Sequence, residues 1–274
     1  MALLAAGAIG QLVYAEGFWA RNSPMGAWQY PIPLDASPET VDWDRFLGQA
    51  PRRPYDPIRF FRWRNYRDYG TGVTGDLFVH LFSSLHFITN SLGPTSVMAT
   101  GGLRYWQDGR DAADVMLGMF DYPETAAHPA FNLSLRCNFV DGTSGSTYLR
   151  LVGSEGSLDV EWDRVVLRKN KVWDPRRAIQ KEFMHDPEPE AEIDRAALMS
   201  TAGTTYVADR SYKGAHYDHF AHFFNAVRGR EPSVVEDAVF GYRAAAPALA
   251  CNQSYYEKRP IAWDPVAMKV VPAR

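Results

Sequence analysis

Short runs in which apolar and polar residues alternate occupy much of the chain, a pattern typical of half-buried β-strands. One run covers residues 11–20, and several more follow one another between residues 95 and 169. Turn signals separate these runs, among them Asp141-Gly142 and the glycine-bounded segment 153–156. Because consecutive strands follow with no helix between them, we expect an antiparallel meander.

Other segments place their apolar residues at helical spacing. Residues 74–89 present such a face, and residues 218–228 and 235–256 predict two further helices. Residues 2–6 resemble the last turns of a helix closed by Gly7, and residues 260–263 predict a last strand. Helices segregated around an antiparallel sheet indicate the α+β class.

Two long stretches lack regular patterning. Residues 22–69 contain seven prolines, which break helices and strands repeatedly, yet they also carry many aromatic residues and arginines. A solvated linker would not hold so many aromatic rings, so we expect an ordered excursion packed on the domain, of the kind that often carries function. Residues 171–210 are polar and weakly patterned, and we expect a surface excursion there.

Composition narrows the function classes. The 274 residues carry 29 basic and 32 acidic side chains, a net charge of −3, so nothing favours nucleic acid as a partner. No apolar run is long enough to cross a membrane. Two cysteines exclude a disulfide scaffold and a cysteine-rich zinc site. The apolar start lacks the basic region of a signal peptide, so we expect a cytoplasmic protein, unless a signal lies on a missing upstream segment.

The run from Gly70 to Gly75 matches the dinucleotide-binding pattern G-x-G-x-x-G letter for letter. That fingerprint requires a buried strand before the glycines and an acidic residue about 20 positions later. The preceding residues 62–69 are polar and aromatic, and no carboxylate stands at residues 94–96. We therefore expect these glycines to form a tight loop that leads into a helix, with no cofactor-binding role.

Asp76 and His80 stand four residues apart at the start of that helix. This spacing places both side chains on one helical face, where a carboxylate can orient an imidazole and the pair can move a proton near neutral pH. A structural interpretation is also open, because a first-turn aspartate is favoured by the helix dipole.

The remaining histidines are less specific. His86 stands six residues beyond His80, which is no ligand spacing, and is interpreted as structural. His216, His219 and His222 could bind a metal ion, but a spacing of three drifts around a helix, and interleaved phenylalanines favour a packing helix. We therefore predict no metal site.

The segment from Tyr69 to His80, with a glycine run followed by D-x-x-x-H, resembles the active-site helix of the Gfo/Idh/MocA oxidoreductases. Further segments extend the resemblance over most of the chain: residues 7–18 resemble the junction between the two domains of that family, residues 35–61 an insert, residues 151–160 a sheet hairpin, and residues 218–228 and 235–263 the closing helices and last strand.

The resemblance implies one substrate and oligomerisation domain over residues 1–274, an α+β fold with a large open, predominantly antiparallel sheet flanked by helices and no Rossmann domain. Residues 1–10 would be the remnant of the junction to a cofactor domain. That domain and its Glu-Lys-Pro motif have no counterpart here, so the chain is interpreted as a fragment, a misassigned start or a natural stand-alone derivative. In the family, the outer face of the sheet commonly builds oligomers.

The resemblance also implies a function. The chain would be the substrate-binding and catalytic half of an oxidoreductase that uses NAD or NADP on a sugar, cyclitol or related polyol, inactive without the cofactor domain. Asp76 and His80 match the catalytic positions of the family, and Arg62, Trp63 and Tyr69 are predicted to wall the substrate pocket. Two alternatives stay open: a non-catalytic carbohydrate-binding or assembly module, and a metal-dependent hydrolase or lyase using the three spaced histidines.

Overall fold

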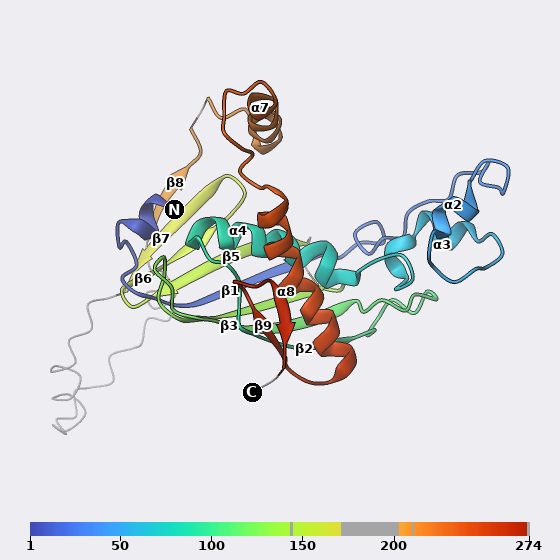
Figure 1. The fold of residues 1–274 in the computed structure, drawn as a ribbon, viewed down its shortest axis with the longest axis horizontal. Coiled ribbons are helices and arrows are strands. Elements are labelled where there is room, and N and C mark those ends of the chain that lie inside the picture. The colour runs from blue at the N-terminus through green and yellow to red at the C-terminus, as the bar shows by residue number, and fades with distance from the viewer. Residues whose placement is uncertain (143–144, 171–202, 210, 273–274) are drawn as a thin grey trace, which may run out of the picture.

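The computed structural model describes residues 1–142, 145–170, 203–209 and 211–272. Their strands form one sheet in the order β10-β9-β2-β3-β4-β1-β5-β6-β7-β8 (Figure 1). The strands are β1 (Leu12–Ala20), β2 (Ser96–Gly102), β3 (Val115–Tyr122), β4 (Phe131–Asn138), β5 (Ser146–Gly153), β6 (Gly156–Val160), β7 (Arg164–Lys169), β8 (Thr204–Val207), β9 (Ile261–Asp264) and β10 (Lys269–Val271). The predicted α+β class with a large, mostly antiparallel sheet is confirmed.

The expectation of an uninterrupted meander is wrong at one place. Strand β1 lies between β4 and β5, parallel to β4 and antiparallel to β5. In this register Glu16 pairs with Ser134 on one side and with Arg150 on the other. An N-terminal strand can enter the middle of a sheet because pairing depends on non-local contacts, which an alternating pattern does not reveal.

The two faces of the sheet differ in what covers them. Along β3 the side chains alternate, so Met116, Phe120 and Tyr122 are buried whereas Leu117 and Met119 point outward. The buried face packs against α4 (Val79–Thr89) and α8 (Ala238–Glu257), which cross the sheet in Figure 1. The core therefore lies between these two helices and one side of the sheet.

Most predicted helices are confirmed, with one refinement. The helix predicted at residues 74–89 begins with a π-helical segment, η2 (Thr74–Phe78), before it continues as α4. The predicted closing helices correspond to α7 (Ala215–Val227) and α8, and the N-terminal α1 (Ala2–Ala5) is followed by Gly7 at a φ of 68°. None of the residues in α7 is buried, and Figure 1 shows this helix standing apart from the strands.

The proline-rich excursion at residues 22–69 forms short helices joined by irregular segments. It contains α2 (Trp43–Leu47), α3 (Pro57–Phe61) and the 3₁₀ helix η1 (Trp63–Asn65), and it projects to one side of the sheet in Figure 1. Asp42 and Asp56 cap the first two helices with their side chains. Most of the polar segment predicted at residues 171–210 lies outside the described residues.

Two further sequence predictions can be compared with the structure. Among the described residues, no helix combines the length and the apolar character that a membrane crossing requires. Cys137 and Cys251 are both free thiols buried in the core, and burial raises the pKa of the Cys251 thiol to about 12.

Candidate functional site

The residues directly before the glycine run Gly70–Gly75 do not form a strand. Before Gly70 the chain forms η1 and a turn from Tyr66 to Tyr69, and Gly72 then adopts a φ of 65° as the chain enters η2. A dinucleotide fingerprint needs a strand that leads directly into the glycine turn. The run therefore serves here as the entry to the helix that carries Asp76 and His80.

Asp76 lies in the π-helical turn, held by an arginine from the excursion. Its carboxylate Oδ1 accepts a hydrogen bond from Arg64 Nε at 2.9 Å, and both side chains are partly exposed. The guanidinium of Arg64 also lies over the Trp63 ring, 4.3 Å from its centroid. Isolated π turns inside helices are frequent at functional sites, which favours a functional interpretation of Asp76.

His80 is exposed on α4, and its ring lies against Trp19 from the end of β1. The two ring centroids are 5.1 Å apart and the planes are inclined by 38°. Within the described part of the chain, no hydrogen bond or ion pair joins His80 to Asp76. Both residues lie near the start of this helix, but each side chain has a different neighbour, and the predicted cooperation between them stays a prediction.

His80 lines a cavity of about 400 Å³ between the sheet and α4. Its described lining combines aromatic, hydroxyl and acidic side chains and includes Trp19, Trp162, Ser83, Thr147, Glu161 and Glu236. Asp76 is not part of this lining, and neither are Arg62, Trp63 and Tyr69. A cavity of this size can hold a small ring-shaped ligand beside the imidazole.

The three predicted substrate contacts bind other parts of the excursion. Arg62 donates from Nε to the Tyr30 carbonyl at 2.9 Å and from a terminal nitrogen to the Gln29 side chain. Tyr69 packs in an aromatic cluster with Trp43 and Phe46, and Trp63 lies under Arg64. In this structure these residues support the segment that presents Arg64 to Asp76.

His86 has the structural role expected of it. Its Nε2 lies 2.8 Å from the Tyr122 hydroxyl inside the core. Burial, with smaller contributions from nearby His128 and Arg243, lowers the pKa of this imidazole to about 3. A histidine held neutral in the core is poorly suited to proton transfer with a substrate.

The three histidines of α7 do not converge. His219 and His222 line a second cavity of about 570 Å³ under α7, whereas His216 lines a different depression on the same helix. Across the described residues, no group of three or more potential ligands is arranged to hold a metal ion. The metal-dependent hypothesis therefore has no ligand set in the part of the chain that the structure describes.

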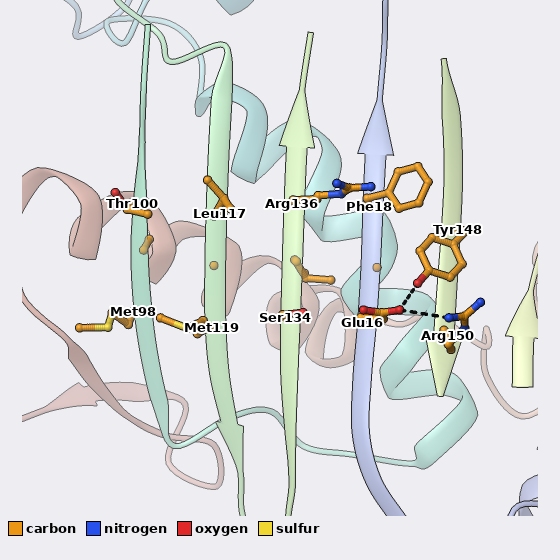
Figure 2. Close-up of a pocket in the computed structure, with 14 residues that line it drawn as sticks. Glu16, Phe18, Met98, Thr100, Leu117, Met119, Ser134, Arg136, Tyr148 and Arg150 are labelled. Carbon is orange, nitrogen blue, oxygen red and sulfur yellow. Dashed lines mark hydrogen bonds and ion pairs between the residues drawn. The ribbon is translucent and has the colours of Figure 1, made fainter. Parts of the chain in front are cut away.

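The face of the sheet opposite the helices carries a broad shallow depression of about 890 Å³ (Figure 2). Met98, Leu117 and Met119 stand exposed at one side of it. At the other side, Glu16 on β1 accepts hydrogen bonds from the Tyr148 hydroxyl and from Arg150 on β5. The open face thus combines an apolar area with a charged network.

Sequence reasoning missed the residues that come from elsewhere to surround His80. Trp19, Trp162 and Glu236 lie more than 50 residues from His80 in the chain, so no spacing rule connects them. The sequence does contain one signal. Trp162 is a large apolar residue between two acidic residues in a turn, where a side chain needed for the core is not expected.

The comparison with protein families gives one match that covers most of the chain. The model of the Gfo/Idh/MocA oxidoreductase family, C-terminal alpha/beta domain, matches residues 39–263. Among curated proteins, none matches the chain in sequence.

Solved structures with the same fold are distant in sequence. An oxidoreductase from Thermotoga maritima has a TM-score of 0.57 at 13% identity, over 98% of this chain and 58% of that one. Levoglucosan dehydrogenase in complex with NADH and levoglucosan has 0.58 at 16%, over 95% and 61%. An oxidoreductase from Agrobacterium radiobacter in complex with NAD⁺, L-tartaric acid and magnesium has 0.55 at 12%, over 98% and 61%. The chain therefore spans about three fifths of the length of these proteins.

Proposed function

Because the chain belongs to the Gfo/Idh/MocA oxidoreductase family, we propose that it is the substrate-binding and catalytic half of an NAD(P)-dependent enzyme acting on a sugar, cyclitol or related polyol. The observation that carries the proposal is the position of His80, exposed in a cavity beside two indole rings. The levoglucosan dehydrogenase structure, of similar fold and with a sugar derivative and NADH bound, supports the substrate and cofactor classes.

The described residues do not themselves fit a dinucleotide. The segment Gly70–Gly75, which matches the pattern G-x-G-x-x-G, follows a 3₁₀ helix and a turn. Its backbone amides are therefore not presented at the end of a strand, as dinucleotide binding requires. In the proposed enzyme a cofactor domain would hold the nicotinamide, which would supply the hydride-transfer chemistry. The residues of this chain deal only with the substrate and its proton.

His80 is the proposed proton acceptor. Its imidazole borders the cavity and is open to solvent, so a substrate hydroxyl placed in the cavity can donate its proton to a ring nitrogen. Asp76, held by Arg64 at the same helix end, is the second proposed catalytic residue. We keep the prediction that the substrate contacts Arg62, Trp63 and Tyr69. In this structure the three side chains contact other residues of the excursion and do not line the cavity.

The proposal extends to self-association. The apolar side of the open sheet face, with Met98, Leu117 and Met119 exposed, favours contact with a second copy of the chain because apolar surface is unstable in water. The alternative, a module that binds carbohydrate without catalysing a reaction, would also self-associate through this face. It differs from the proposed enzyme because it has no turnover that depends on His80.

Turnover measurements on the complete enzyme, this chain together with its cofactor domain, test the proposed chemistry. His80→Asn and Asp76→Asn should each lower kcat by roughly 10²–10⁴, the usual contribution of general acid–base catalysis. His216→Asn is the matched control, because that imidazole is exposed on α7 away from the cavity. Wild-type turnover in both active-site variants would exclude these residues from the chemistry.

A further inference from the structure

The cavity at His80 has a wall made of two indoles. Trp19 comes from the end of β1, and Trp162 comes from the turn between β6 and β7. Their ring centroids lie 6.0 Å apart with the planes nearly perpendicular, at 86°. The imidazole of His80 also lies against Trp19, with the two ring centroids 5.1 Å apart. An object placed against the indoles is therefore next to the proposed proton acceptor.

Trp162 is 76% exposed although it is one of the largest apolar side chains. The turn that carries it is fixed by an ion pair, with Arg164 Nε at 2.7 Å from Glu161 Oε2. Packing in the described chain does not account for an indole held in this way at the mouth of a cavity. An indole face offers a flat apolar surface with little conformational entropy to lose on binding.

The charged side chains in the described lining of the cavity, apart from His80, are acidic. Glu161 and Glu236 line it, and the described lining includes no lysine or arginine. Glu161 is paired with Arg164, whereas Glu236 is exposed and its carboxylate has no hydrogen bond or ion pair within the described chain. Hydroxyl groups are also present, from Ser83 and Thr147. Such a lining can accept and donate hydrogen bonds to a polyol, but it repels a carboxylate.

We propose that the exposed indole of Trp162, with Trp19 standing perpendicular to it, forms a platform on which a neutral sugar ring stacks near His80, and that the carboxylate of Glu236, unpaired among the described residues, excludes sugars carrying a carboxylate. The inference rests on the proposed function and deepens it: the substrate is a neutral sugar or its derivative, and uronic or aldonic acids are rejected. Trp162 and Glu236 are thereby specificity-determining residues.

Binding to the 274-residue chain provides the test, with methyl β-D-glucopyranoside and methyl β-D-glucuronide as a pair that differs only in the carboxylate. Saturation-transfer NMR titrations should give saturable binding of the glucoside and at least about tenfold weaker binding of the glucuronide. Equal affinities, tighter binding of the glucuronide, or binding of neither sugar would overturn the proposal.

Variants connect this affinity to the platform. Trp162→Ala should weaken glucoside binding by about two- to tenfold, since it removes the flat apolar face against which the sugar ring stacks. Tyr105→Ala is the matched control, because Tyr105 is 63% exposed on a loop outside the cavity. Glu236→Gln should narrow the difference between the two sugars. An unchanged affinity in Trp162→Ala, or an unchanged difference in Glu236→Gln, would contradict the assignment.

Circular dichroism of each variant checks that the sheet is intact, and Trp162→Phe, which retains a ring, should bind the glucoside better than Trp162→Ala. Sugar affinity and turnover separate the two levels of the argument. If Trp162→Ala binds the glucoside normally, the platform is wrong, but turnover can still depend on His80. If His80→Asn has wild-type turnover, the catalytic role of His80 is wrong, but the chain can still bind the sugar.

Discussion

Arg64 holds Asp76: its Nε donates to the carboxylate at 2.9 Å, and thereby joins the end of the proline-rich excursion to the helix of the candidate site. The pair is partly exposed, so its contribution to the free energy of unfolding should stay below about 1 kcal/mol. Its importance in the proposed enzyme is positional, since it fixes the carboxylate at the start of the helix that carries His80.

Arg64→Ala in the complete enzyme should therefore lower kcat by about an order of magnitude, less than the loss expected for a general acid–base residue, while the midpoint of urea unfolding changes little. Arg67→Ala is the control, because Arg67 lies over the Tyr256 ring, 3.7 Å from its centroid, and does not contact Asp76. Equal kcat values for the two variants would remove the positioning role.

A nucleotide titration tests the proposal that the nicotinamide cofactor binds to another domain and not to this chain. The 274-residue chain should show no saturable micromolar binding of NADH or NADPH when energy transfer from its eight tryptophans is followed. The reason is that its glycine run lacks the strand that would present the amides to a pyrophosphate. The complete enzyme is the positive control, and saturable binding by the chain alone would assign it a nucleotide site.

Self-association through the open sheet face makes a separate prediction. Met119→Asp, at a residue that is 57% exposed in the chain, should raise the dissociation constant of the assembly at least about tenfold, because a charge would be buried without a partner. Leu34→Asp changes an exposed leucine on the excursion and should leave association unchanged. Sedimentation velocity measures both, and a monomeric wild-type chain would exclude this interface.

The buried imidazole of His86 should make stability fall in acid. Its pKa is lowered from 6.5 to about 3 in the folded state, so the unfolded chain binds the proton first as the pH decreases. The contribution of His86 to stability is thus complete above about pH 6.5 and is lost progressively down to about pH 3, with a limiting slope of about 1.4 kcal/mol per pH unit.

Urea unfolding at several pH values between 7 and 4 measures that slope. His86→Gln should flatten it by most of this amount, whereas Tyr122→Phe removes the hydrogen-bond partner but retains the titrating group and should keep the slope. The same slope in wild type and His86→Gln would show that other groups dominate the acid dependence.

Asp114 is a buried residue with a purely structural role. One carboxylate oxygen accepts from the Arg104 amide at 2.7 Å, and the other accepts from the amides of Tyr105 and Trp106 at 2.8 Å each. Asp114→Ala leaves these donors without a partner and should destabilise the fold by about 3 kcal/mol. Asp35→Ala, at an exposed aspartate, should change stability by less than about 0.5 kcal/mol in the same denaturation experiment.

Local patterns predicted most elements of the fold because local forces decide them. The strand at Val115–Tyr122 was readable from its alternation, and the helix at residues 74–89 from its apolar face and its glycine entry. The position of β1 was not readable, since an alternating strand carries no record of which neighbours it pairs with. The π turn at Asp76 was hidden for a related reason: it changes the hydrogen-bond register without changing the apolar spacing.

The candidate site shows the same limit. The spacing of Asp76 and His80 pointed to one helix end, but Trp19, Trp162 and Arg64 reach it from three other segments. Arg62 and Tyr69 stand close to Asp76 in the sequence, yet their side chains bind within the excursion. Proximity in sequence therefore does not show which side chains of the excursion line the cavity at His80, and the predicted substrate contacts stay a prediction.

The insertion of β1 between β4 and β5 also bears on how the protein is made. Glu16 and its partner Arg150 are separated by 134 residues, so at about 5–20 residues per second a ribosome needs about 7–27 s after making β1 to produce the strand that completes its pairing. The first strand has no neighbour until β4 is made, and its other edge stays unpaired until β5 follows. The middle of the sheet therefore closes long after its first strand is made, and nascent chains halted before residue 131 should expose both edges of β1 to chaperones and proteases.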